Sequence, residues 1–186
     1  MSDRHRRLRA LLVDYEPSTE AERRHHRDIT DLLEKPTAFE RDEYGPGHIT
    51  ASGFVVHPTR QSVVLVEHRK LGRWLQPGGH IDPSDTDIEA SARREVMEET
   101  GLEDMTGMGI VDLDVHSFPA RDGQPHHLHL DVRMGFVAGS ADLIHSHEST
   151  GIAWVPFEVV LSMDESLARA VRRLEALHSA GTLRPD

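Results

Sequence analysis

The sequence predicts an α/β fold in which helices cover both faces of a mixed β-sheet. Segments with helical and extended patterns follow one another in the order helix, strands, helix, strands, helix, which is the order expected when helices pack on both faces of a sheet. The strand-like segments are rich in β-branched residues and are separated by turns. A glycine-containing loop connects the first two of them to a central acidic helix.

The chain is expected to consist of an N-terminal helical extension at residues 1–45 and a main domain at residues 46–186. The extension begins with a short helical segment that ends before Pro17. One face of this segment carries an apolar stripe made of Leu8, Leu11 and Leu12.

A second helix of the extension is predicted to begin at the capping box Thr19-x-x-Glu22 and to end at Pro36. It contains a basic cluster at residues 23–27, a pattern that nucleic-acid-binding proteins also use. Acidic residues are interleaved with this cluster, so a solvated helix face is the better interpretation.

The main domain begins with a change of sequence period from helical to extended. Alternating and β-branched runs bounded by turn residues predict strands. These runs lie at residues 49–57, 61–67, 108–118, 127–137 and 152–155.

Two helices are predicted within the main domain. The central acidic helix should begin at the capping box Thr86-x-x-Glu89 and end at Gly101, a residue type preferred just after a helix. The last helix should begin at Ser162-x-x-Glu165, and one face of it carries Leu167, Val171, Leu174 and Leu177.

Three glutamates of the central helix carry the functional prediction. Glu95, Glu98 and Glu99 are separated by three and four residues, so they are neighbours within an arc of about 100° on the helix surface. The same arc carries small or apolar residues suited to the protein interior, namely Ile88, Ser91 and Ala92. Carboxylates that face inward repel one another and are costly to desolvate unless a cation compensates them. The pattern therefore predicts a divalent-metal site.

The competing interpretation is an ordinary solvated helix, which is what most glutamate-rich helices are. Two features argue against it here. Glu89, Arg93 and Arg94 already supply a polar, freely exposed side for this helix. In addition, the turn formers at residues 76–83 would fold a loop back over the start of the helix. Together these features favour the metal site.

Composition excludes several classes of protein. The formal net charge of −11 argues against a general nucleic-acid binder, because such a chain repels polyanions. The absence of cysteine excludes disulfides, thiolate metal sites and cysteine nucleophiles. The sequence has no apolar run of transmembrane length and no secretory segment, so a cytoplasmic protein without membrane contact is expected.

The segment from Gly79 to Leu102 resembles the conserved motif of the Nudix hydrolase family. That motif is Gly, five residues, Glu, seven residues, then Arg-Glu-U-x-Glu-Glu-x-Gly-U, where U is a bulky aliphatic residue. Residues 94–102 match its second half at every defined position. The flanking segments at 74–79 and 154–157 also resemble the approach to and the exit from the motif. The resemblance implies a Nudix-like α/β/α sandwich.

The resemblance also implies the reaction and its cofactor. Family members use water, and usually Mg²⁺, to cleave a nucleoside diphosphate linked to another moiety, so the expected partner is a small phosphorylated molecule. Oxygen ligands suit Mg²⁺, with Mn²⁺ as the alternative. Position by position, the implied ligands are Glu95, Glu98, Glu99 and the backbone carbonyl of Gly78 or Gly79. Glu148, in the loop before the last strand, is the candidate for a further acidic ligand.

Arg94, Glu95 and Glu98 are the expected catalytic residues. Arg94 would pair with a helix carboxylate and orient it, the alternative being an exposed surface arginine. The general base would be Glu95 or Glu148. In one place the chain departs from the family motif: the loop acid falls on Asp85, and a one-residue insertion before the helix explains the changed spacing. No role is assigned to Asp85 on this basis.

Histidines suggest where the substrate binds. His127, His129 and Asp131 alternate along one strand, so their side chains project from one face. This strand occupies the position where the family lines its substrate pocket, and His80 lies beside the glycine turn, so these four residues are the candidate substrate contacts. A solvent-facing strand and an independent zinc or iron site are the alternatives for the alternating residues. His145 and His147 flank Glu148 and are expected on a loop.

Two other functional classes compete with the hydrolase. A non-catalytic nucleotide-sensing module of the same fold is the runner-up, although such modules usually lose the motif's carboxylates. A relative of the isopentenyl-diphosphate isomerases is set aside because those enzymes depend on a cysteine. Nucleoside triphosphates, dinucleoside polyphosphates and nucleotide sugars all remain open as substrates, because residues outside the motif select the substrate. For the N-terminal helices, the two expectations are a cap over the pocket and a homodimer contact.

Overall fold

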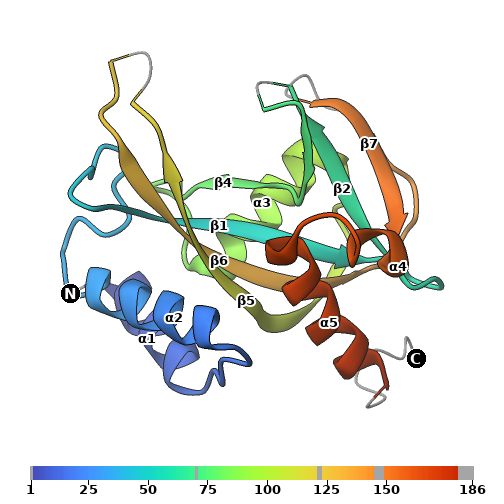
Figure 1. The fold of residues 1–186 in the computed structure, drawn as a ribbon, viewed down its shortest axis with the longest axis horizontal. Helices are drawn as coiled ribbons and strands as arrows, with labels where there is room; N and C mark the ends of the chain where they lie inside the picture. Colours follow the sequence, from blue (N-terminus) through green and yellow to red (C-terminus); the bar gives the residue numbers. More distant parts are fainter. Residues whose placement is uncertain (1, 70, 121–122, 145–148, 180–186) are drawn as a thin grey trace.

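A computed structural model describes residues 2–69, 71–120, 123–144 and 149–179. Seven of the described segments form one sheet with the path β3-β2-β1-β6-β5, while β4 pairs with β1 and β7 pairs with β2 (Figure 1). The strands are β1 Gly47–Val56, β2 Ser62–His68, β3 Arg73–Leu75, β4 Gly78–His80, β5 Met105–Phe118, β6 His127–Ala138 and β7 Ser149–Pro156. The helices are α1 Asp3–Val13, α2 Glu20–Leu32, α3 Ile88–Thr100, α4 Phe157–Val160 and α5 Glu165–Ser179.

The sheet is mixed because β1 runs parallel to β6 and antiparallel to β2 and β4. This arrangement places residues that are distant in the sequence side by side. His48 of β1 lies opposite His129 of β6, and Thr50 lies opposite Asp131. The prediction of an α/β fold with a mixed sheet is confirmed.

Helices cover both faces of the sheet, and strand β1 shows how the two faces are divided. All ten residues of β1 are buried. Successive side chains of a strand point to opposite faces. Ile49 and Val55 belong to one buried apolar cluster together with residues of α1, α2 and α3. Phe54 and Val56 belong to a second cluster together with residues of α4 and α5.

The predicted strands are confirmed to within a few residues at each end, whereas three short elements were not expected. The turn-forming run at residues 76–83 was predicted as a loop, but it contains β4, and β3 directly precedes it; each of these strands has three residues. The four-residue helix α4 was also missed. Segments this short span only about one period of a strand or helix, so no repeating pattern can be recognised in them.

Two of the three predicted helix caps fall on a different residue. Thr19 caps α2 as expected, accepting a hydrogen bond from the backbone N–H of Glu22 at 3.1 Å. Helix α3 is capped by Asp87 rather than Thr86, and Asp87 Oδ1 accepts from the N–H of Ala90 at 2.9 Å. At the start of α5, Asp164 Oδ1 accepts from the N–H of Ser166 at 2.8 Å, in place of Ser162. In both cases a carboxylate, which is a strong N-cap acceptor, replaces the predicted hydroxyl.

The N-terminal helices share the core of the sheet. Leu8, Leu12 and Ile29 are buried in the same cluster as Ile49, whereas Leu11 is 38% exposed and does not belong to the predicted inward stripe. A backbone hydrogen bond also attaches the N-terminal segment to strand β1, since the N–H of Ile49 donates to the carbonyl of Ala38 at 2.8 Å.

The basic cluster of α2 is only partly solvated, which corrects the predicted exposed face. Its arginines are exposed. His25, however, is half-buried and hydrogen-bonds through Nδ1 to the carbonyl of Leu113 on β5 at 2.9 Å. His26 hydrogen-bonds through Nε2 to the carbonyl of Leu12 on α1, also at 2.9 Å. These two histidines fasten α2 to the sheet and to α1.

A buried glutamate connects the two ends of the chain. Glu22 of α2 is 0% exposed and accepts hydrogen bonds from the hydroxyl of Tyr15 and from the hydroxyl of Ser18, the latter at 2.8 Å. Arg173 of α5 lies 3.7 Å from Glu22 and donates to the carbonyl of Glu16 at 2.6 Å. The pKa of Glu22 is lowered, because these hydrogen bonds outweigh the effect of burial.

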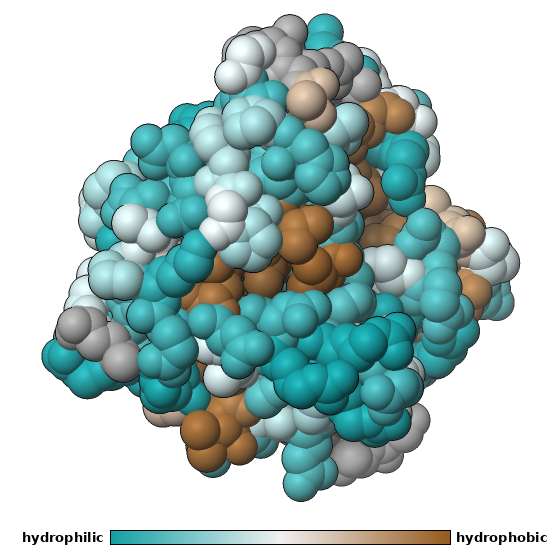
Figure 2. Space-filling model, turned by 60° about the vertical axis from the view of Figure 1, so that its left-hand side comes forward, coloured by the Kyte–Doolittle hydropathy of each residue, from teal (hydrophilic) through white to brown (hydrophobic). Residues whose placement is uncertain are grey.

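One face of the molecule is mostly hydrophilic. Figure 2 shows this face, with an apolar group near its centre and further apolar groups at its right and lower edges. Within the described residues, no helix combines the length and the apolar character needed to cross a bilayer.

Gly101 provides a test of the end of α3. Its φ of 74° is left-handed, and an added Cβ would lie 2.7 Å from Cβ of Ile144. Gly101→Ala should therefore lower the free energy of unfolding by at least about 1–2 kcal/mol, measured by urea denaturation. Gly72→Ala is the matched control, because Gly72 has a φ of 59° with nothing within 4 Å of an added Cβ. Equal losses in the two variants would contradict the predicted collision.

Candidate active site

Two glycines allow strand β4 to lie close against β1. Gly78 is paired with Ser52 and Gly79 with Ala51. A Cβ added at Gly78 would lie 2.3 Å from Cβ of Ser52, so only glycine fits this position. The carbonyl of Pro77 also accepts a hydrogen bond from the N–H of Gly53 at 2.9 Å. The turn before α3 is thus fixed to the central strand of the sheet.

Helix α3 packs against the same strand through Val96. A Cβ added at Gly53 would lie 2.4 Å from Cγ2 of Val96, so the absence of a side chain at Gly53 lets the helix approach the sheet. The inward arc predicted for α3 is buried at Ile88, Ser91 and Ala92. This packing fixes which helix residues face the glycine turn.

Glu95 and Glu99 both lie against the glycine turn. The backbone N–H of Gly78 donates to Glu99 Oε1 at 2.8 Å. The carboxylate of Glu95 lies beside Gly79, where an added Cβ would be 2.8 Å from its Oε2. The side chain of Glu95 is 14% exposed. Two of the three predicted carboxylates therefore converge on the turn.

Glu98 occupies a different position, at the solvent edge of this group. Its side chain is 53% exposed, so the prediction that all three glutamates face inward is wrong for this residue. Position 98 lies on the same side of the helix as Arg94, one turn away, and this arginine links it to Glu95. Glu148, the fourth predicted acidic ligand, lies outside the described residues, as do His145 and His147.

Arg94 is the centre of the hydrogen-bond network. Its guanidinium contacts Asp85 with two nitrogens, Nε to Oδ1 at 3.2 Å and Nη2 to Oδ2 at 2.9 Å. Nη1 donates to Glu95 Oε1 at 2.8 Å and to Glu98 Oε2 at 3.3 Å. Nη2 also donates to the carbonyl of His80 at 2.9 Å. One side chain thus ties together the loop, the glycine strand and two helix carboxylates.

Arg93 and Arg94 were predicted to lie on the freely exposed side of α3, and this prediction is wrong for both. The side chain of Arg94 is only 23% exposed. Its pKa is raised, chiefly by the hydrogen bonds to Asp85, so it remains charged. Arg93 donates to the carbonyl of Met105 at 2.7 Å, and its guanidinium carbon lies 4.8 Å from the ring centre of Phe136. Arg93 therefore attaches α3 to the sheet instead of solvating it.

Asp85 is a residue that sequence reasoning did not assign. Its carboxylate is 7% exposed and accepts from Arg94 and from the backbone N–H of Asp82, the latter at 2.9 Å. Burial alone would raise the pKa of Asp85, but the hydrogen bonds from Arg94 and Asp82 prevail and lower it. The available signal was an acidic residue in the glycine loop, displaced by one position from the spacing of the motif.

Asp131 is surrounded by internal hydrogen-bond donors. It is 2% exposed and accepts hydrogen bonds from Thr50 at 3.1 Å, Ser52 at 2.7 Å, Gln76 at 3.3 Å and Arg133 at 3.2 Å. Its carboxylate therefore fixes the residues around the glycine turn. The solvent-facing alternative for this strand does not hold, because His127 is 4% exposed and His129 is half-buried.

His80 and His129 extend the site along the sheet. Their rings lie 5.2 Å apart, and His80 directly follows the glycine turn. Burial, together with neighbouring histidines, lowers the pKa of His80 to about 4 and that of His129 to about 2. Both imidazoles are therefore neutral near pH 7, available as hydrogen-bond donors and acceptors but not as cations.

The carboxylates and the imidazoles suit different ions. The groups at the glycine turn are oxygen ligands: Asp85, Glu95 and Glu98 surround Arg94, and Glu99 accepts from the backbone of Gly78. This donor set fits a hard cation such as Mg²⁺ or Mn²⁺. Among the described residues, however, the group of three possible ligands whose donor atoms lie within 4.8 Å of one another consists of histidines: His48, His80 and His129.

Comparison with known proteins agrees with this architecture. The family model described as NUDIX domain matches residues 47–174. The Bacillus subtilis (strain 168) protein named "Putative 8-oxo-dGTP diphosphatase" is 28% identical over 95 residues, which cover 51% of this chain and 58% of that protein. The chain thus matches little more than half the length of this curated relative.

Solved structures with the same fold include hydrolases from different organisms. A NUDIX-family hydrolase from Clostridium perfringens superposes with a TM-score of 0.53 at 24% identity, covering 70% of this chain and 97% of that one. An Ap4A hydrolase from C. elegans gives 0.55 at 19% identity, covering 71% and 98%. The NUDIX domain of Shewanella oneidensis NrtR, complexed with ADP ribose, gives 0.51 at 21% identity, covering 75% and 93%. At these identities the likeness establishes the fold.

The link between Asp85 and Arg94 predicts a pH-dependent loss of stability. Asp85→Asn removes a nearly buried charged acceptor and should lower the free energy of unfolding by about 1.5–3 kcal/mol at pH 7. The pKa of Asp85 is lowered in the folded protein, so its contribution is present above the ordinary carboxyl pKa of about 4 and is lost as the pH falls below it.

Urea denaturation at several pH values measures this effect. Wild type and Asp85→Asn should differ at pH 7 and converge in acid. Glu103→Gln, which alters an exposed carboxylate just after α3, should behave as wild type throughout. A difference that stays constant from pH 7 to pH 3 would show that the charge of Asp85 is not its source.

Proposed function

Since this chain belongs to the NUDIX domain family, we propose that it hydrolyses a diphosphate linkage in a nucleotide or another nucleoside diphosphate derivative, with Mg²⁺ or Mn²⁺ as cofactor. The observation that supports this best is the approach of Glu95 and Glu99 to the glycine turn, with Arg94 holding Glu95 in place. The relative named as a diphosphatase is consistent with the same reaction.

Charge explains why a metal ion belongs in the proposal. The substrate is an anion, while the chain has a net charge of −11 and its site is built from carboxylates. When bound, Mg²⁺ offsets the phosphate charge and lowers the pKa of a bound water, which supplies a nucleophile near neutral pH. We assign the metal to Glu95, Glu98 and Glu99, helped by the carbonyl of Gly78 or Gly79. Glu148 is proposed as a further ligand from its place in the sequence.

Arg94 positions the carboxylates for this role. Its hydrogen bond to Glu95 Oε1, at 2.8 Å, directs one oxygen of that carboxylate toward the arginine. Its two contacts with Asp85 hold the guanidinium itself in place. The positive charge of Arg94 also attracts the carboxylate of Glu95 at this distance, which keeps it beside the glycine turn. Glu95 and Glu148 remain the two candidates for the general base.

The glycine turn brings the backbone of β4 close to the helix carboxylates. Gly78 and Gly79 have no side chains, so the turn lies directly against Ser52 of β1 and the carboxylate of Glu95. We propose that the diphosphate binds beside this turn, next to the metal ion that the carboxylates would hold. The rest of the substrate would extend along the sheet toward His80, His127 and His129. Asp131 is buried by its internal donors, so we assign it the role of a positioning residue and not a direct contact.

Hydrolysis of a nucleotide panel tests the proposal. The panel contains nucleoside triphosphates, dinucleoside polyphosphates, ADP-ribose and nucleotide sugars, each with Mg²⁺, and release of phosphate or nucleoside monophosphate is measured. Glu99→Gln and Glu98→Gln each keep the side-chain size but remove a charge. The kcat should fall by about 10²–10⁴-fold, with the larger loss at the inward-facing Glu99.

Glu103→Gln is the matched control and should retain wild-type kcat, because its carboxylate is exposed and outside the network. Two outcomes would count against this proposal, the first against the assigned site and the second against hydrolysis itself. Turnover that is unchanged in Glu99→Gln would place the chemistry elsewhere. Tight binding of a panel compound without turnover by wild type would favour the nucleotide-sensing module.

A further inference from the structure

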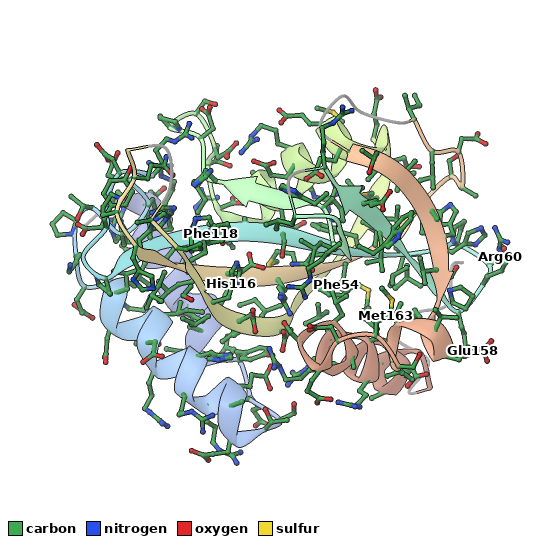
Figure 3. The ribbon with its side chains drawn as sticks, turned by 45° about the horizontal axis from the view of Figure 1, so that its top comes forward. Phe54, Arg60, His116, Phe118, Glu158 and Met163 are labelled. Carbon is green, nitrogen blue, oxygen red and sulfur yellow. The ribbon has the colours of Figure 1, made fainter. Side chains whose placement is uncertain are left out.

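Five histidines gather at one end of the sheet, although they come from four different strands. His48 lies on β1, His80 on β4, His116 on β5, and His127 and His129 on β6. Strand pairing brings them together, since His129 lies opposite His48 on one side and opposite His116 on the other. Figure 3 shows His116 at this end of the sheet beside Phe118, far from Arg60 and Glu158 at the other end.

Three of these imidazoles form a compact group. The rings of His48 and His129 are 4.8 Å apart, those of His48 and His80 are 5.0 Å apart, and those of His80 and His129 are 5.2 Å apart. One nitrogen from each ring lies within 4.8 Å of the others. An ion bound tetrahedrally at about 2.0–2.1 Å holds its nitrogen ligands roughly 3.4 Å apart, so each ring needs to move inward by only about 1 Å.

His48 presents a buried lone pair to this group. It is 0% exposed, and its Nδ1 lies 3.1 Å from the carbonyl of Glu43. A carbonyl only accepts hydrogen bonds, so Nδ1 carries the proton of the neutral ring and Nε2 carries the lone pair. Among the described residues, Nε2 is buried and has no hydrogen-bond partner. A ring that donates one N–H to a backbone carbonyl and offers its other nitrogen is the usual form of a metal-binding histidine.

The same reasoning fixes the tautomer of His129. His127 Nδ1 lies 2.8 Å from the carbonyl of Pro125, so it donates, and Nε2 of His127 is an acceptor. His129 Nε2 lies 3.3 Å from that acceptor and therefore carries a proton in the neutral ring. The lone pair of His129 is then on Nδ1. His127 thus acts as an orienting partner of His129, as second residues around metal sites commonly do.

Two aromatic side chains pack against histidines of this cluster. The ring of Phe118 lies 4.0 Å from that of His129, and the ring of Tyr44 lies 5.0 Å from that of His127. Packing of rings accounts for these contacts, but it leaves Nε2 of His48 without a donor. The lone pair of this nitrogen is therefore available to a ligand.

We propose that His48, His80 and His129 form a binding site for a transition-metal ion of the Zn²⁺ class, separate from the carboxylates of α3. Imidazole ligands select Zn²⁺, Co²⁺ or Ni²⁺ over Mg²⁺, which prefers oxygen. Three protein ligands leave a fourth position for water or for an anionic group. The site replaces the set His127, His129 and Asp131 considered from the sequence, because Asp131 is enclosed by its own donors.

A bound ion would join β1, β4 and β6 through side chains. His80 directly follows Gly79, and its carbonyl accepts from Arg94 at 2.9 Å. The ion would therefore hold the C-terminal end of the glycine turn against the sheet. This inference depends on strand pairing and tautomers alone, so it stands whether or not the chain hydrolyses diphosphates.

Metal titration of the full chain, produced without a polyhistidine tag and stripped with a chelator, tests the site. The buffer contains millimolar Mg²⁺ to occupy the carboxylates. Wild type should bind one equivalent of Co²⁺ with visible absorption bands, and Zn²⁺ should displace it. His80→Gln and His129→Gln should each weaken Co²⁺ binding by at least about 100-fold, more than loss of a second-shell partner usually costs. His48→Gln should do the same, with folding checked by circular dichroism.

Two controls separate this site from other histidines and from the carboxylates. His116→Gln alters an exposed imidazole of the same cluster and should bind Co²⁺ as wild type does. The double variant Glu98→Gln with Glu99→Gln should also retain full binding. The proposal is overturned if wild type binds no stoichiometric Co²⁺ or Zn²⁺, if His80→Gln and His129→Gln bind normally, or if the glutamate variant loses the ion.

Discussion

The bridge from Arg94 to Asp85 and Glu95 is the interaction on which the site depends. Carboxylates of the loop and of the helix lie within hydrogen-bond distance of this single guanidinium. Without a cation among them, these carboxylates would repel one another and open the loop away from α3. Arg94 also reaches the carbonyl of His80, so the glycine strand is held by the same charge. One side chain therefore holds helix α3, the loop before it and strand β4 together.

Much of the fold was predictable because its patterns are local. A β-branched run bounded by turns identified β1, alternation was visible along β6, and glycine at position 101 identified the end of α3. The errors were local too. Thr86 and Ser162 were expected as helix caps, but an aspartate one or two residues further along accepts the hydrogen bond in each case. β4 was invisible because its pairing with β1 depends on close backbone approach, and no side-chain pattern records such contact.

The site was predictable only where helical spacing defines it. The interval of four residues placed Glu95 and Glu99 on one side of α3, and both face the glycine turn. Spacing could not show that Glu98 lies at the solvent edge, since this depends on how deeply the helix packs against Gly53. His48 was not singled out, because its importance arises from pairing with His129, a residue far away in the sequence.

The buried contact between Glu22, Tyr15 and Arg173 has a practical consequence for fragment design. This contact joins the N-terminal segment to helix α5. The family match at residues 47–174 contains Arg173 but neither Glu22 nor Tyr15. A recombinant piece trimmed to that match would leave Arg173 without its acidic counterpart. It would also expose to solvent the apolar residues of the sheet that Leu8, Leu12 and Ile29 now cover. Crystallisation work should therefore keep the first 46 residues.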